Sequence, residues 1–113
     1  MRIYLLLSLF LSVNSFGCDN ATEKFYSWAN LKVFPEKVSN QISNAEAQKR
    51  EHSGKSYYVQ LVCDSGDILM LTKRLNGKVF FQIDYLDNAK GIYGKITTNS
   101  EGKITEYVHD KSL

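Results

Sequence analysis

The chain has 113 residues, with 14 lysines and arginines against 12 aspartates and glutamates, so its formal net charge is +2. This near-neutral balance excludes nucleic acid as the expected main partner, because binding to phosphates needs a concentrated basic face. The length predicts one small domain, and neither a phosphate-cradling glycine loop nor a nucleophile elbow is present.

Residues 1–17 have the pattern of a signal peptide. A basic residue near the start precedes a short apolar run, and small residues stand at Ser15 and Gly17, the positions that a signal peptidase reads. The run is too short to cross a membrane, which takes about 20 apolar residues. We therefore expect cleavage before Cys18, export to the periplasm or the extracellular space, and one mature domain over residues 18–113.

Cys18 and Cys63 are the only cysteines of the chain, and two alternatives are open for them. In an oxidising compartment they form the one disulfide that two cysteines allow. Alternatively, Cys18 carries lipid, as in a bacterial lipoprotein, and Cys63 stays a free thiol. Phe16 departs from the small residue that is usual in lipoprotein signals. The first alternative predicts a secreted or periplasmic protein, and the second a membrane-anchored one.

Residues 22–51 are predicted to be helical. Thr22 is suited to cap a first short helix, and Pro35 to begin a second one, where its missing N–H costs nothing. Gly54 is expected to end the second helix. The apolar side chains on the expected buried sides are Phe25, Trp28, Val38, Ile42 and Ala45.

After Gly54 the apolar pattern changes to a period of two, which is typical of strands. The expected strands are 57–63, 68–75, 78–85, 92–98 and 103–108. The sequence thus predicts an α+β fold, in which an N-terminal helical segment packs on an antiparallel β-meander of about five strands.

Asn76-Gly77 is the strongest hairpin signal of the chain, and it predicts a two-residue type I′ turn. If the pairing continues unbroken from Leu75 opposite Lys78, Met70 lies opposite Ile83, on an apolar face that meets the helix. The other face is mixed in character and is the expected binding surface for a partner. Its candidate residues are Leu69, Leu71, Lys73, Leu75, Lys78, Phe80 and Gln82.

No residue pattern predicts a catalytic, cofactor or metal site. His52 and His109 have no partner at the spacing of a known motif. The carboxylates at the strand ends, Asp64, Asp67, Asp84 and Asp87, are explained by turn chemistry, although they are also the only acid–base groups from which an enzyme of this sequence would be built. Asn20 begins a glycosylation sequon, which matters only in a eukaryote.

These patterns favour a small exported binding protein without catalytic activity, such as a periplasmic or secreted inhibitor or an immunity protein. A protein partner is expected, and a homodimer is an alternative to a foreign partner. The competing hypothesis is an envelope lipoprotein with an assembly or structural role, which depends on lipid at Cys18; only that alternative places the protein on a membrane.

Overall fold

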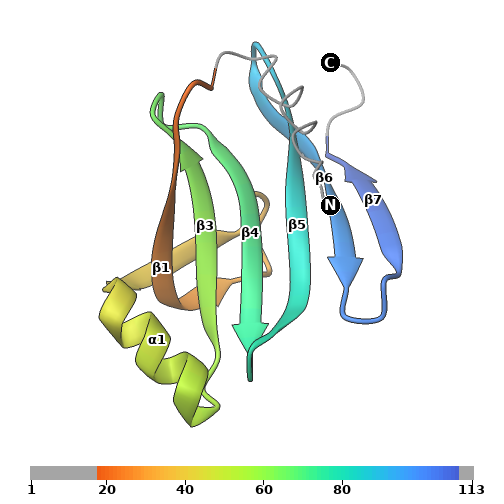
Figure 1. The fold of residues 1–113 in the computed structure, drawn as a ribbon. Helices are drawn as coiled ribbons and strands as arrows, with labels where there is room; N and C mark the ends of the chain where they lie inside the picture. The colour runs from red at the N-terminus through yellow and green to blue at the C-terminus, as the bar shows by residue number, and fades with distance from the viewer. Residues whose placement is uncertain (1–17, 110–113) are drawn as a thin grey trace, which may run out of the picture.

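The computed structural model describes residues 18–109, so the predicted signal peptide lies outside the described residues. One antiparallel sheet of seven strands, in the order β2-β1-β3-β4-β5-β6-β7, makes up most of the fold (Figure 1). Its elements are β1 (Ala21–Asn30), β2 (Lys37–Ile42), α1 (Asn44–Ser53), β3 (Tyr57–Cys63), β4 (Ile68–Leu75), β5 (Lys78–Asn88), β6 (Gly91–Asn99) and β7 (Ile104–Val108). No helix within 18–109 is long and apolar enough to cross a membrane.

The predicted helical segment over residues 22–42 is wrong, and with it the α+β fold class and the five-stranded meander. These residues form β1 and β2, and β1 pairs with β2 on one side and β3 on the other. Aromatic residues such as Phe25 and Trp28 favour strands, and pairing along β3 satisfies the backbone groups of β1. Pro35 lies in the loop between β1 and β2, not at the start of a helix.

The only helix of the described residues is α1, and its ends are defined by side-chain and backbone caps. Ser43 accepts a hydrogen bond from the backbone N–H of Glu46 at 3.0 Å, which is the standard N-cap interaction. Gly54 adopts a left-handed conformation with φ 77°, and its N–H bonds to the carbonyl of Arg50. The predicted end of the helix at Gly54 is therefore confirmed.

The Asn76-Gly77 turn is confirmed, but the register beyond it differs from the unbroken pairing that the turn alone predicts. Both turn residues have positive φ, 55° and 74°, as a type I′ turn requires. Arg74 then pairs with Val79, whereas Lys73 pairs with Phe81, so Phe80 is an extra residue in a β-bulge. One extra residue in β5 shifts every pair beyond the bulge by one position. Each residue of β4 there therefore shares its face with a different set of β5 residues from the set that unbroken pairing predicts.

Because of this bulge, Leu71 lies opposite Ile83, and Met70 lies opposite Asp84. The expected apolar face, with Met70 and Ile83 on the same side, is therefore wrong. The face that carries Leu71 forms the larger core. Its buried residues are Ala29, Tyr58, Leu71 and Ile83, with Tyr26, Val38, Phe81 and Tyr85 packed around them.

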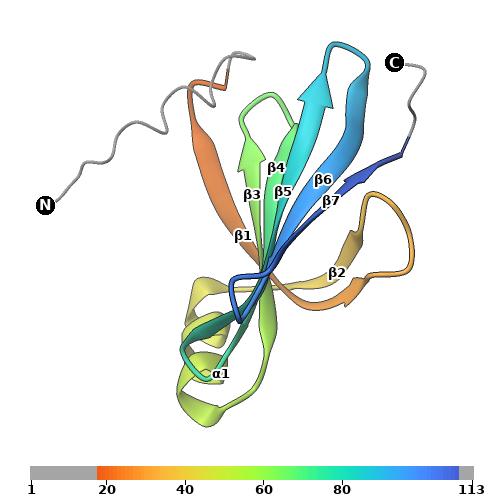
Figure 2. The same cartoon turned by 90° about the vertical axis from the view of Figure 1, so that its right-hand side faces the viewer.

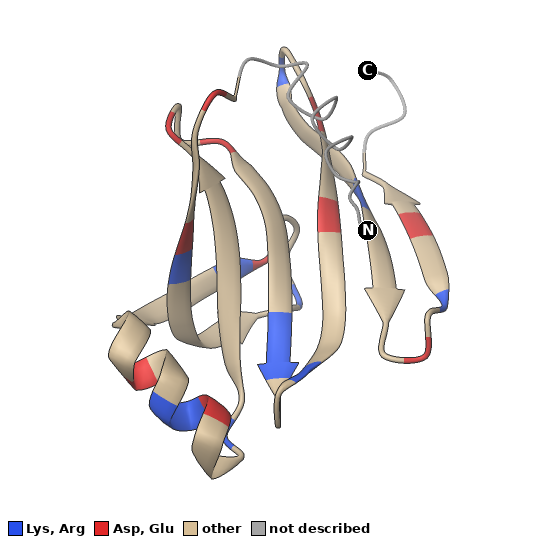
Figure 3. Cartoon of the chain, viewed as in Figure 1, with Lys and Arg blue, Asp and Glu red and all other residues tan. Residues whose placement is uncertain are grey.

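A smaller core lies on the opposite face, beneath α1. Ala47 of the helix is 1% exposed and packs with Tyr57 and Val59 of β3, where Phe25 and Ile42 complete the cluster. Figure 2 shows the two covering segments on opposite sides of the sheet, with α1 on one and the β1–β2 loop on the other. Figure 3 shows basic and acidic residues spread over the fold without a strongly charged region, and β3 carries none of them.

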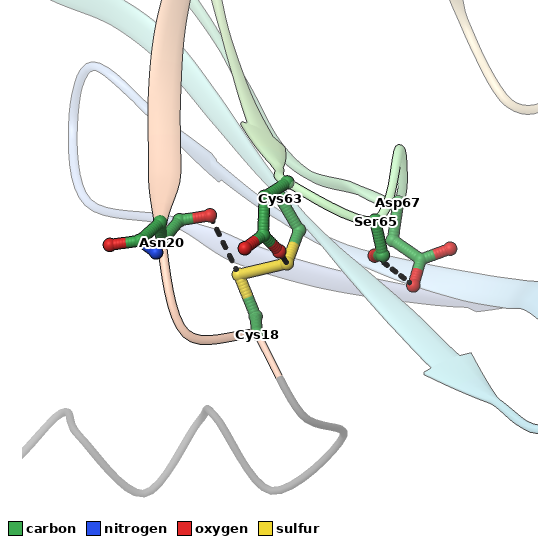
Figure 4. The surroundings of a disulfide bond; sticks show 6 residues. Cys18, Asn20, Cys63, Ser65 and Asp67 are labelled. Carbon is green, nitrogen blue, oxygen red and sulfur yellow. Dashed lines mark hydrogen bonds between the residues drawn. A yellow bond between two sulfur atoms is a disulfide. The ribbon is translucent and has the colours of Figure 1, made fainter.

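The disulfide between Cys18 and Cys63 is formed, as predicted (Figure 4). It joins the segment before β1 to the end of β3, where Ala21 pairs with Cys63 and the N–H of Asp64 bonds to the carbonyl of Asn20 at 2.8 Å. The bond is compatible with an exported protein, because disulfides persist in oxidising compartments.

The disulfide predicts the mass of the natural protein. We expect the chain that begins at Cys18 to be lighter than its reduced form by the mass of two hydrogen atoms, because no thiol is left free. Intact-mass spectrometry before and after reduction measures this difference. A chain heavier by a diacylglyceryl group on Cys18 would contradict the disulfide, since the same sulfur cannot form both bonds.

Replacing Gly77 by valine is expected to destabilise the protein by at least about 1 kcal/mol. A β-branched residue is strained at φ 74°, and a Cβ atom here would lie 3.1 Å from Oε2 of Glu51. Urea unfolding measures the change, and Gly77→Asn is the matched control, because asparagine tolerates this conformation better. Equal stability of the two variants would show that the left-handed conformation is not what matters.

Candidate binding site at the β1–β2 loop

The loop between β1 and β2, residues 31–36, is held in a defined shape by contacts at both ends. At its start, the side-chain oxygen of Asn30 accepts a hydrogen bond from the N–H of Lys32 at 3.0 Å, an interaction that closes a local turn. At its end, Glu36 turns into the protein while Leu31, Lys32 and Val33 stay exposed. The loop is therefore held to the protein by one polar residue, Glu36, and it leaves the apolar side chains of Leu31 and Val33 exposed to solvent.

Glu36 is the anchor, and it is buried although it is charged, with only 4% of its surface exposed. Its Oε1 accepts a hydrogen bond from the hydroxyl of Tyr85 at 2.8 Å, and its Oε2 forms an ion pair with Nζ of Lys95. Tyr85 and Lys95 are direct cross-strand partners on β5 and β6. Both carboxylate oxygens are thus satisfied, as a buried charge requires.

The environment of Tyr85 keeps its hydroxyl protonated. Burial, followed by the hydrogen bond to Glu36 and the negative charge of that residue, raises the pKa of Tyr85 far above its ordinary value. The raised pKa favours the protonated hydroxyl, the form that donates the hydrogen bond to Glu36. We call the contacts of Glu36 with Tyr85 and Lys95 the clasp, because they hold the β1–β2 loop against the sheet.

Phe34 provides a second anchor on the far side of the loop. Its ring lies 5.3 Å from that of Tyr107, nearly edge-on, and 5.1 Å from the ring of His109. Nζ of Lys95 lies over the rings of Phe34 and Tyr107, at 5.7 and 5.8 Å from their centroids, distances typical of cation–π contacts. His109 therefore belongs to an aromatic cluster, which its sequence position did not indicate.

An open cleft of about 510 Å³ lies between this loop and the sheet. Its lining residues are Leu31, Glu36, Phe80, Phe81, Ile83, Lys95, Thr97, Asn99, Ser100 and Glu101. Leu31 and Phe80 are large apolar side chains that stay 43% and 49% exposed. A cleft with apolar contacts and a few polar groups has the make-up of a ligand or partner site.

The seven candidate residues of the sequence analysis do not form one surface. Leu71 is completely buried, so it is not available to a partner. Gln82 pairs with Thr72, on the opposite face from Lys73 and Phe81. Lys78 and Phe80 are exposed, while Leu69, Lys73 and Leu75 are partly buried. Of the seven, only Phe80 lines the cleft, and Lys73 stands over its ring at 5.2 Å.

Sequence reasoning missed the clasp. Glu36 and its two partners are separated by 49 and 59 residues along the chain, and no motif spacing connects them. One local feature could have drawn attention to Glu36: it is the only acidic residue between Glu23 and Glu46.

A second polar cluster fastens α1 to the opposite face of the sheet. Oε1 of Glu51 accepts hydrogen bonds from the hydroxyl of Tyr57 at 2.5 Å and from Nε of Arg74 at 3.2 Å. The bond from Tyr57, followed by the bond and charge of Arg74, lowers the pKa of Glu51 against the opposing effect of burial. The cluster links the helix to β3 and β4.

The lowered pKa of Glu51 makes the stability of the protein pH-dependent. Stabilisation by this group is fully present above its ordinary pKa and is lost as the pH falls through the lowered value in the folded protein. We expect Glu51→Gln to be less stable than the parent at pH 7, and the gap to shrink below about pH 4. Thermal unfolding across pH measures it, with Glu46→Gln, in the more exposed pair with Arg50, as the control. A gap that stays constant with pH would contradict the assignment.

Within residues 18–109, one cluster of potential metal ligands comes together, and it is not free to bind a metal. Cys18, Cys63 and Asp64 lie close together, but both sulfurs are joined in the disulfide and offer no thiolate. The structure brings Asp67 near Asp87, where burial, followed by the charge of Asp67, raises the pKa of Asp87. Asp84 accepts a hydrogen bond from Gln82 at 3.2 Å.

Comparison with known proteins adds no relative. No protein-family model matches the chain, and neither a curated protein nor a solved structure is significantly similar to it.

Proposed function

We propose that this chain is a small exported binding protein without catalytic activity, and that its partner is a protein that inserts a side chain into the cleft beneath the β1–β2 loop. The observation that carries the proposal is the clasp of Glu36 with Tyr85 and Lys95. It holds the loop above the sheet, with Leu31 and Phe80 left exposed at the cleft. Such preorganisation lowers the entropic cost of binding.

The chemistry of the cleft supports binding over catalysis. Both oxygens of Glu36 are occupied, Lys95 is committed to the same carboxylate, and the pKa of Tyr85 is raised. A general base must reach a substrate proton, and Glu36 is buried, with 4% of its surface exposed. Glu101 is the remaining titratable residue of the lining, and it is exposed, on the turn between β6 and β7.

The disulfide supports the secreted or periplasmic form of this proposal over the lipoprotein form. The thiol of Cys18 is consumed in the bond to Cys63, and lipid attachment would require that sulfur. An inhibitor or an immunity protein for an exported enzyme fits the size and the absence of a catalytic motif in the sequence.

The test compares two variants in partner capture. The protein is immobilised and exposed to an extract of the exported proteins of its own source. We expect the double variant Leu31→Ser, Phe80→Ser to lose its bound protein while it keeps its melting temperature. Ile104→Ser, at an apolar residue that is 67% exposed and is not among the residues that line the cleft, is expected to retain the protein.

Two outcomes would contradict the proposal. Retention by the double variant would show that the cleft is not the binding surface. A captured protein that proves to be the same chain, or a parent protein that elutes as a dimer in gel filtration while the double variant elutes as a monomer, would assign the cleft to self-association.

A further inference from the structure

The tip of the β1–β2 hairpin combines exposed apolar side chains with unpaired lysines. We define the hairpin tip by its exposed residues Trp28, Leu31, Lys32, Val33 and Lys37. Trp28 is 54% exposed, the largest exposed fraction of an aromatic side chain in the described chain, and Leu31 and Val33 are 43% and 37% exposed. Clusters of apolar groups left in water mark surfaces for proteins or for membranes.

The hairpin tip carries charge of one sign. Glu36 is the only acidic residue between Glu23 and Glu46, and it is buried and neutralised by Lys95. Lys32 and Lys37 make no ion pair within residues 18–109. The clasp thus neutralises the one acidic residue between Trp28 and Lys37 and leaves two positive charges beside three apolar side chains. The exposed Glu101 lines the cleft together with Leu31 and is the nearby acidic group outside the hairpin.

The arrangement in space brings these residues to one end of one hairpin. Trp28 pairs with Ser39, and Asn30 pairs with Lys37, so the strands are in register up to the loop. Figure 2 shows this loop projecting to one side of the sheet, away from α1. The loop is fixed to the sheet through Glu36 and Phe34, so only side chains that are not engaged in these contacts are available to a surface.

We propose that the hairpin tip docks on an anionic membrane surface, with Trp28, Leu31 and Val33 at the level of the headgroups and Lys32 and Lys37 against the lipid phosphates. Tryptophan is favoured at this interface because its ring is apolar and its N–H is polar, and lysines near an anionic surface add electrostatic attraction. This docking needs no lipid on Cys18, and it goes beyond the proposed function, because Leu31 is the only residue of the hairpin tip that also lines the cleft.

Charge and shape together favour a membrane over an acidic protein as the partner of the hairpin tip. An acidic protein would satisfy the same lysines, but it would also be expected to fill a concavity, and the concave part of this region is the cleft, of which only Leu31 belongs to the hairpin tip. The other residues of the hairpin tip do not line the cleft, and their aromatic, aliphatic and basic side chains have the composition of a membrane-interface anchor.

The chain contains a single tryptophan, so the fluorescence of Trp28 reports directly on the hairpin tip. We expect its emission to shift to shorter wavelength when vesicles of phosphatidylglycerol and phosphatidylcholine are added, and the protein to sediment with these vesicles. Vesicles of phosphatidylcholine alone should cause neither change, and inorganic phosphate at the same concentration should leave the spectrum unchanged, which distinguishes a lipid surface from free phosphate.

Charge reversal provides the matched comparison. Lys32→Glu, Lys37→Glu is expected to weaken partition onto the anionic vesicles at least about tenfold, since each lysine near the surface contributes about fivefold. The control is Lys49→Glu, Lys90→Glu, which changes the net charge equally at exposed positions on α1 and on the β5–β6 turn. We expect this control to bind as the parent does.

Three results would overturn the proposal. They are an unchanged spectrum of Trp28 with anionic vesicles, an equal loss of binding in both charge-reversal variants, and a spectral shift that appears on raising the protein concentration without lipid. The last would show that a second copy of the chain covers the hairpin tip. The first two results do not bear on capture at the cleft, so in these cases the two proposals fail separately. The third would also bear on the cleft, because Leu31 belongs to both surfaces.

Discussion

Replacing Glu36 by alanine is expected to destabilise the protein by about 3–5 kcal/mol, the range for breaking a buried charge pair. The change leaves Nζ of Lys95 and the hydroxyl of Tyr85 without their shared acceptor. The loss should lie toward the lower end of the range, because the side chain of Lys95 is 22% exposed and water can reach it. Urea unfolding at neutral pH measures the effect.

Two controls separate the clasp from a general effect of charge. Glu101→Ala removes an exposed carboxylate from the lining of the same cleft and should change stability by less than about 0.5 kcal/mol. The double variant Glu36→Ala, Lys95→Met should recover part of the loss, since it no longer leaves a buried ammonium unpaired. A loss of stability in Glu36→Ala that is no larger than the loss in Glu101→Ala would contradict the contact.

Replacing Leu71 by alanine is expected to cost about 2–5 kcal/mol, as for other fully buried leucines. Leu71 has no exposed surface, and it lies in the cluster with Tyr58 and Ile83. The bulk of the larger core is aromatic, so the neighbouring rings are not expected to collapse fully into the cavity that is left. Denaturant unfolding of the parent and the variant measures the change.

The same substitution at Leu31, which is 43% exposed, provides the comparison. Leu31→Ala is expected to cost less than about 1 kcal/mol, because little of its apolar surface leaves water on folding. Similar losses at the two positions would mean that Leu71 is not in the core, and that the bulge at Phe80 does not set the register described here.

Local patterns determined the second half of the fold. Alternation of apolar and polar residues located β3 and β4 at their observed bounds, and it located β5, β6 and β7 with differences at their ends. The Asn-Gly turn and the glycine after α1 were recognisable because each needs a backbone conformation that few residues adopt. The disulfide followed from having two cysteines and an export pattern.

The structure of the segment that forms β1 and β2 could not be predicted from local patterns, because apolar residues at short spacing suit both a helix face and a strand. Phe25 and Trp28 lie three residues apart, as on a helix, but β1 is stabilised by pairing with β3, whose residues come more than 30 positions later. Only the assembled sheet decides between the two structures, since strand pairing is a contact distant in sequence.

The binding surface depends on tertiary structure even more strongly. One extra residue at Phe80 exchanged the two faces of the β4–β5 hairpin, so that Leu71 became core and Gln82 moved to the opposite face. The clasp of Glu36 joins three segments that no local pattern connects. The sequence by itself determined which segments pair and turn locally; only the tertiary structure decided which side chains meet, because burial and charge pairing depend on neighbours that are far apart along the chain.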